Sequence, residues 1–222
     1  MRKIIICIYN KKMNLRSYEH TNELNDIRIE QVFKNDKFLL FNVISDKQEL
    51  PILKTSDVIV NSITNSNDSV WNMTITIMNE KDLKCIKNID NFYIKLIEHR
   101  SEQLFGEQFD SFEIFDENIV IPSILSSTKK LTVHCIEKNG IELCKNICFG
   151  IYEPNKTMIN AERLVPDSIC RCAIRPWMLQ IRPKTQRVRI LWIIEQCMIL
   201  EEPVNTDCIL NPDDQEEDDN ST

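Results

Sequence analysis

The chain contains the run Ala173-Ile-Arg-Pro-Trp-Met-Leu-Gln-Ile-Arg182, then Pro183-Lys-Thr-Gln186, then Arg187-Val-Arg-Ile-Leu-Trp-Ile-Ile-Glu195. Apolar residues, several of them β-branched or aromatic, make up most of both long runs, and the connection between them is short and polar. This pattern is typical of two paired strands. We therefore expect a β-hairpin formed by residues 172–181 and 187–200.

Side chains alternate between the two faces of a strand, and this alternation divides the side chains of residues 187–195 between two faces. Arg187 and Arg189 fall on one face, and Val188, Ile190 and Trp192 fall on the other. The hairpin is expected to present arginine to solvent while its reverse side joins the core.

Further β-rich runs precede this hairpin, at residues 27–33, 37–44, 57–63, 70–78, 131–137 and 141–149. Asn139-Gly140 between the last two runs is a strong hairpin signal. Between residues 82 and 105 apolar residues recur every three or four positions without Pro or Gly, which predicts a helix or a broken pair of helices ending at Gly106. The expected fold is mainly β with a central helical insertion (α+β), arranged as an OB-like antiparallel barrel or a sandwich.

A length of 222 residues with 42% hydrophobic residues suits a single β-rich domain, expected over residues 1–204 with its helical segment at about 80–106. With only 3 Gly, the chain has little from which to build a Gly-rich phosphate loop. No apolar stretch is long enough to cross a bilayer, and the short N-terminal apolar run lacks a cleavage site for secretion. We expect an intracellular protein that is not secreted and has no membrane partner.

Charge is distributed unevenly along the chain. The formal net charge is −7, yet residues 163–189 contain seven basic residues and one acidic residue. From residue 195 onward there are ten acidic residues and no basic one, so residues 1–194 hold 27 basic against 24 acidic residues. Residues 205–222 have too few apolar side chains to fold alone and are expected to form a disordered acidic tail. Such a tail could occupy a basic surface in place of a polynucleotide, recruit partner proteins, or simply aid solubility.

Arginines and tryptophans on paired strands suit a single-stranded nucleic acid, because guanidinium groups hold phosphates and aromatic rings stack on bases. The alternative is that Trp177 and Trp192 are core residues and the arginines form a solvated face. On the first interpretation Trp177 is the stacking residue. The candidate nucleic-acid-binding residues are Arg171, Arg175, Trp177, Arg182, Lys184, Arg187 and Arg189.

The nine cysteines are odd in number and scattered, which indicates reduced thiols rather than a disulfide framework. A zinc site would draw on His134, Cys135, Cys144, Cys148, Cys170 and Cys172, but the chain has no Cys-x-x-Cys and these spacings match zinc sites poorly. The three histidines, His20, His99 and His134, belong to no recognisable catalytic motif. The sequence therefore predicts no enzyme, no metal and no cofactor, with buried free thiols in place of a zinc site.

The segment Asn91-Phe-Tyr-Ile-Lys-Leu-Ile-Glu-His-Arg-Ser-Glu-Gln-Leu-Phe-Gly106 resembles a helix of the single-stranded DNA-binding proteins of large eukaryotic (nucleocytoplasmic) DNA viruses. In that family the helix closes with Ser-Glu-x-x-Phe-Gly, matched here by Ser101, Glu102, Phe105 and Gly106, and an acidic, aromatic segment follows, as at 109–122. Residues 189–196, Arg-Ile-Leu-Trp-Ile-Ile-Glu-Gln, are similar to the family's basic strand pair, although the expected glycine before the tryptophan is absent. The resemblance covers roughly residues 70–200.

The resemblance and the charge pattern together favour a non-catalytic single-stranded DNA-binding protein of viral DNA replication, recombination or repair. Its partners would be single-stranded DNA and, through the tail, replication proteins; it would act in the host nucleus or at a cytoplasmic replication site. DNA against RNA preference and homo-oligomer formation stay open. The alternative is a virion or regulatory protein whose arginine face meets an acidic protein and ignores nucleic acid.

Overall fold

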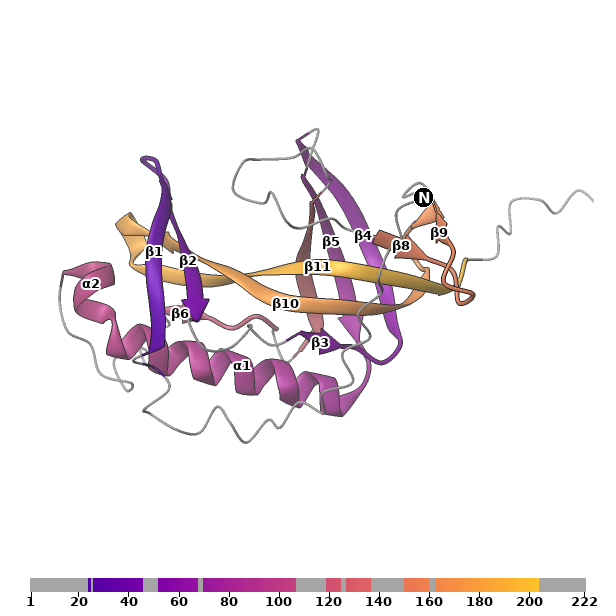
Figure 1. The fold of residues 1–222 in the computed structure, drawn as a ribbon, viewed down its shortest axis with the longest axis horizontal. Helices are drawn as coiled ribbons and strands as arrows, with labels where there is room; N and C mark the ends of the chain where they lie inside the picture. The colour runs from indigo at the N-terminus through magenta and orange to yellow at the C-terminus, as the bar shows by residue number, and fades with distance from the viewer. Residues whose placement is uncertain are drawn as a thin grey trace, which may run out of the picture.

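The computed structural model describes residues 24, 26–45, 52–67, 70–106, 119–124, 127–136, 150–159 and 163–203. Within these ranges the chain forms eleven strands and two α-helices (Figure 1). The elements are β1 (Ile27–Lys34), β2 (Leu39–Ser45), β3 (Leu53–Lys54), β4 (Val58–Asn67), β5 (Val70–Ile77), α1 (Glu80–His99), α2 (Ser101–Phe105), β6 (Val120–Ile121), β7 (Lys130–Ile136), β8 (Gly150–Tyr152), β9 (Met158–Ile159), β10 (Ile169–Arg182) and β11 (Arg187–Glu201).

Five strands close into a ring that forms the barrel part of the fold. β4 pairs with β5, β5 with β7, β7 with β11, β11 with β10, and β10 returns to β4. In chain order the five strands of the ring are β4, β5, β7, β10 and β11. The third strand, β7, lies beside the fifth, β11, which is the OB-like arrangement. The predicted fold class is confirmed. The sheet is mixed rather than wholly antiparallel, because β11 runs parallel to β6, β7 and β8.

The hairpin of β10 and β11 continues beyond the ring and supports a second group of strands. Met178–Ile181 of β10 pairs with Leu39–Asn42 of β2, and β2 pairs with β1. Figure 1 shows the β1–β2 hairpin and the β4–β5–β7 group projecting from the same side of the β10–β11 ribbon, near opposite ends of it. The ribbon therefore belongs to both parts of the molecule.

Helix α1 lies along the opposite side of the ribbon and packs its apolar stripe against the sheet (Figure 1). Ile86, Tyr93, Leu96 and Ile97 on this stripe are buried, as their three- and four-residue spacing predicts. The helix begins after Asn79, whose side chain accepts a hydrogen bond from the backbone N–H of Lys81. The second helix ends at Gly106, whose φ of 83° is a left-handed conformation that glycine adopts readily.

A buried polar link ties α1 to the barrel. The Trp192 indole N–H donates to Ser123 Oγ at 2.7 Å, and Ser123 donates from both its hydroxyl and its backbone N–H to the Asp90 carboxylate of α1. Burial raises the pKa of Asp90 to about 6, against the smaller opposing effect of the two Ser123 hydrogen bonds. Trp192 itself is 1% exposed, so the core interpretation is correct for this tryptophan.

Several predictions from the sequence fall outside the described residues. They include the strand at 141–149, the Asn139-Gly140 turn, most of the acidic, aromatic segment at 109–122, and the tail at 205–222. The single-domain boundary at residue 204 likewise stays a prediction. In the described part of the chain, neither helix combines the length and apolarity needed to cross a membrane.

Candidate nucleic-acid interface

The distal half of the β10–β11 ribbon, which is the half nearest the turn at residues 183–186, has one charged face and one apolar face. Arg182 is paired with Arg187, and Gln180 with Arg189, and residues directly opposite each other across two strands project to the same face. The reverse face carries Ile181 opposite Val188, both almost fully buried. The alternation predicted for Arg187 and Arg189 is therefore confirmed.

Four cations at this end are exposed: Arg182, Lys184, Arg187 and Arg189. Within the described part of the chain none of them forms an ion pair. Pro183–Thr185 forms a short 3-10 turn between the strands, and Gln186 completes it with a φ of 51°. Four positive charges without carboxylate partners on one short ribbon form an electrostatic surface that favours a polyanion.

Trp177 lies on the same ribbon at a β-bulge. The pairing of β10 with β11 shifts between Pro176 and Met178, so Trp177 has no direct cross-strand partner. Its side chain is half-buried, and its ring centroid lies 6.4 Å from that of His134 on β7. Burial, with a smaller effect from the Arg189 guanidinium, lowers the pKa of His134. An uncharged imidazole, an indole and a guanidinium thus share one environment where β7 meets the ribbon.

Arg171 and Arg175, the other two candidate arginines, are engaged by carboxylates. Arg171 Nε lies 2.7 Å from Asp57 Oδ1 in an exposed ion pair, and Arg175 Nε lies 2.5 Å from Glu195 Oε1 in a half-buried pair. Eleven residues of extended strand place Arg171 about 36 Å from Arg182. The structure therefore brings Arg182, Lys184, Arg187 and Arg189 to one end of the ribbon, places Trp177 near its middle, and leaves Arg171 at the far end.

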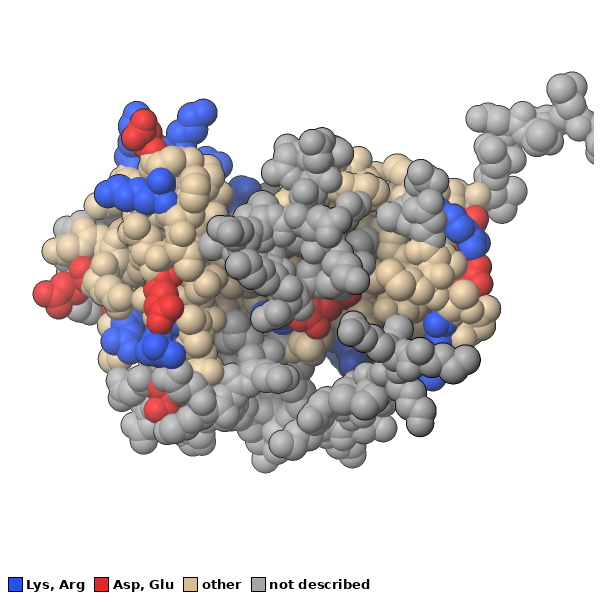
Figure 2. Space-filling model, turned by 45° about the horizontal axis from the view of Figure 1, so that its top comes forward, with Lys and Arg blue, Asp and Glu red and all other residues tan. Residues whose placement is uncertain are grey.

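The sequence analysis missed a second source of positive charge, the turn between β1 and β2. Lys34 and Lys37 flank this turn and are exposed, and β2 starts beside the end of β10, so the two turns lie at the same end of the sheet. In Figure 2, Lys and Arg side chains gather at the end of the molecule that carries the β1–β2 hairpin, with Asp and Glu side chains among them. The basic residues around Asn35-Asp36 were a weak signal, because the sequence does not reveal that β2 pairs with β10.

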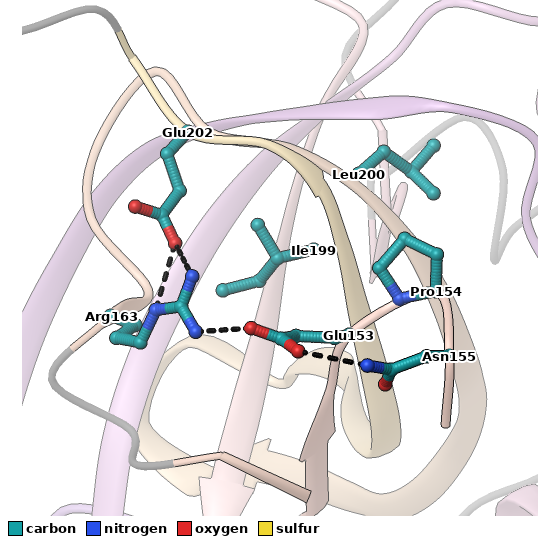
Figure 3. Close-up of a pocket in the computed structure, with 7 residues that line it drawn as sticks. All are labelled: Glu153, Pro154, Asn155, Arg163, Ile199, Leu200 and Glu202. Carbon is teal, nitrogen blue, oxygen red and sulfur yellow. Dashed lines mark hydrogen bonds and ion pairs between the residues drawn. The ribbon is translucent and has the colours of Figure 1, made fainter. Parts of the chain in front are cut away.

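A hollow of about 500 Å³ lies at the opposite end of the ribbon (Figure 3). Its lining residues are Glu153, Pro154, Asn155, Arg163, Ile199, Leu200 and Glu202. The Arg163 guanidinium lies between the carboxylates of Glu153 and Glu202 and pairs with both. Hydrogen bonding from Arg163 lowers the pKa of Glu153. With two carboxylates against one guanidinium, this hollow repels phosphate and is a poor nucleic-acid site.

The described cysteines do not form a metal centre. Cys135, Cys170, Cys172 and Cys197 are buried free thiols, and Cys172 Sγ lies 3.9 Å from Cys197 Sγ. Burial raises the pKa of Cys135 to about 12, which keeps this thiol protonated. Among the residues that the structure describes, no three His, Cys, Asp or Glu side chains are placed to hold a metal ion. Cys144 and Cys148 of the zinc alternative lie outside these residues.

No protein-family model and no curated protein matches the chain. Among solved structures, the chain is similar to the crystal structure of gp2.5, a single-stranded DNA-binding protein encoded by bacteriophage T7. The two sequences are 11% identical, the match covers 70% of this chain and 88% of that chain, and the TM-score is 0.44. At this degree of likeness, function is inferred from the side chains of this chain alone. The resemblance to proteins of large eukaryotic DNA viruses stays a prediction.

Proposed function

We propose that the chain is a non-catalytic single-stranded DNA-binding protein that acts in DNA replication, recombination or repair. The observation that carries the proposal is the outer face of the β10–β11 ribbon, where Trp177 lies five residues along β10 from the first of four cations that have no carboxylate partner among the described residues. Arg182, Lys184, Arg187 and Arg189 would hold phosphates, and Trp177 would stack on a base. This combination binds a flexible single strand with little demand on its sequence.

The architecture supports the same location. OB-folds bind oligonucleotides on the face of their second and third strands and through the loop between the fourth and fifth. In this chain those elements are β5, β7 and the turn between β10 and β11. His134 of β7 beside Trp177 joins the barrel face to the cationic ribbon.

Arg171 and Arg175 would contribute in a different way. Each must exchange a carboxylate of the protein for a phosphate, so part of the gain from the new contact is lost in breaking the old one. Their contribution to affinity should therefore be smaller than that of the four unpaired cations. The acidic tail, residues 205–222, would compete with DNA for the cationic ribbon. It would also provide a contact for replication proteins.

The experiment is a titration of fluorescent oligothymidine with the full-length protein at several salt concentrations, with duplex DNA of the same length as the control. Each phosphate neutralised on a single strand contributes about −0.7 to the slope of log K against log salt, so four contacts give roughly −3. A slope near zero, or equal affinity for the duplex, would refute the proposal. Retained affinity for an acidic protein with no affinity for oligothymidine would favour the alternative of a protein-interaction module.

A further inference from the structure

The β1–β2 hairpin ends in a turn whose shape is fixed by Asn35. The Asn35 side-chain oxygen accepts hydrogen bonds from the backbone N–H groups of Lys37 at 2.9 Å and Phe38 at 2.8 Å. The Asn35 backbone N–H donates to the Phe38 carbonyl at 3.0 Å. These three bonds hold the backbone of Phe38 in place at the surface.

Two aromatic rings lie together at this turn. The ring centroids of Phe33 and Phe38 are 5.7 Å apart, with an angle of 31° between the planes. Phe33 is 41% exposed, and in the described part of the chain no other aromatic side chain is exposed to this extent. A pair of rings held at the surface offers π-faces to a ligand at little cost in side-chain freedom.

The strand register places Phe33 on the same face as the cationic ribbon. Phe33 is paired with Leu40, Leu40 with Gln180, and Gln180 with Arg189, so the four side chains form one row across β1, β2, β10 and β11. Three strand spacings separate Phe33 from Arg189 by about 14 Å. Gln180 lies two strand spacings from Phe33 and three residues along β10 from Trp177. These two steps are roughly perpendicular, so Phe33 lies roughly 14 Å from Trp177.

Charge on this hairpin matches a polyanion. Lys34 and Lys37 have no ion-pair partner in the described part of the chain, and Asp36 is the only acid of the turn. Glu30, farther along β1, is engaged by Arg28 at 3.1 Å. Lys37 lies in the turn next to Phe38, so together with Arg182, Lys184 and Arg187 on the neighbouring turn it places positive charge beside the aromatic pair. Lys34 is paired with Leu39, in the row of Ile181 and Val188, and therefore projects from the reverse face.

We propose that Phe33 and Phe38 form a second base-stacking position, with Lys37 as its phosphate contact, so that a single-stranded polynucleotide crosses the β10–β11 ribbon from Trp177 to the β1–β2 hairpin. The inference rests on the proposed function and extends it, because this hairpin lies outside the five-stranded ring. The occupant is single-stranded nucleic acid, since its bases need aromatic faces and its phosphates need the surrounding cations.

The test measures the affinity of the full chain carrying Phe33→Ala or Phe38→Ala for oligothymidine of about 16 and about 4 nucleotides, the two ends of the site-size range of an OB-fold. With the longer strand each variant should bind roughly 5- to 150-fold more weakly than the unaltered protein, while Phe33→Tyr should bind nearly as well. With the shorter strand, which can bind at Trp177 alone, the loss should be about twofold or less. Met158→Ala is the matched control, because Met158 is 65% exposed on β9, at the other end of the molecule.

A salt titration separates the two kinds of contact. Lys37→Gln should make the salt slope shallower by about 0.7, whereas Phe33→Ala should leave it unchanged. Lys34→Gln is the matched control for charge and should also leave the slope unchanged, because Lys34 projects from the reverse face.

Failure of the unaltered protein to bind oligothymidine would overturn the proposed function and this inference together. Binding by the unaltered protein with Phe33→Ala and Phe38→Ala equal to Met158→Ala would overturn the inference alone. If sedimentation shows that Phe33→Ala dissociates an oligomer without weakening DNA binding, a second copy of the chain covers the hairpin, and the inference is wrong.

Discussion

Replacing Arg182 and Arg187 together by glutamine tests the cationic ribbon most directly. The two side chains are directly opposite each other across β10 and β11, are exposed, and have no ion-pair partner in the described part of the chain. The four unpaired cations of the ribbon contribute about −2.8 to the slope of log K against log salt, and the two that remain in the double variant contribute about −1.4. Between 50 and 200 mM salt, the ribbon cations should therefore account for a roughly 50-fold fall in affinity in the unaltered protein but only about a 7-fold fall in the double variant.

The control is Lys129→Gln combined with Arg163→Gln, which removes the same total charge from the protein. Arg163 is engaged by Glu153 and Glu202, and Lys129 by Glu80, and neither belongs to the proposed site. Fluorescence anisotropy with labelled oligothymidine measures both double variants over the same salt series. If they change the slope equally, binding depends on net charge rather than on the distal ribbon, and the assignment of Arg182 and Arg187 to the DNA interface is wrong.

Three further predictions concern the tryptophan, the tail and the core. Trp177→Ala should weaken oligothymidine binding roughly 5- to 150-fold while Trp177→Phe retains most of it, and an unchanged affinity of Trp177→Ala in the same anisotropy assay would remove Trp177 from the site. Deleting residues 205–222 should tighten single-strand binding, most strongly at low salt, because the polyanionic competitor is lost; equal affinities with and without the tail would contradict this. Because the pKa of Asp90 is raised to about 6 in the folded state, its protonated form stabilises the fold, and this contribution is lost as pH rises through 6. Between pH 5 and pH 7, the free energy of unfolding measured in urea should fall by about 1 kcal/mol more for the unaltered protein than for Asp90→Asn. Equal falls for the two proteins would show that Asp90 does not titrate in this range.

Local pattern was enough to predict the elements that form the interface. Alternation along residues 187–192 predicted that Arg187 and Arg189 lie on one face of the strand and Val188 and Trp192 on the other, because one face of that strand had to be buried. The helix over residues 82–105 followed from its apolar spacing, and Asn35-Asp36 marked the turn between the first two strands. Each of these features depends on residues close together in the chain.

Contacts between distant segments were beyond prediction. Nothing local indicates that Leu40 pairs with Gln180, 140 residues later, and this pairing is what brings Phe33 to the cationic face. The ion pair that occupies Arg171 is of the same kind, since Asp57 lies 114 residues before Arg171. The bulge at Trp177 is a further case, because a bulge changes which face a side chain joins without leaving a reliable mark in composition.

The β10–β11 ribbon joins binding to the core, because its two faces serve different purposes. Trp192, Ile190 and Val188 on the inner face are almost fully buried, so the backbone beneath Arg187 and Arg189 is held by the packing of the barrel and of α1. A ligand that binds cations on a rigid ribbon loses less free energy to ordering the protein than one that binds a mobile loop. A core change such as Trp192→Phe, which removes the hydrogen bond to Ser123, should therefore weaken single-strand binding without altering the number of phosphates contacted. Affinity would fall while the salt slope stays the same, whereas Arg182→Gln with Arg187→Gln should lower affinity and make the slope shallower.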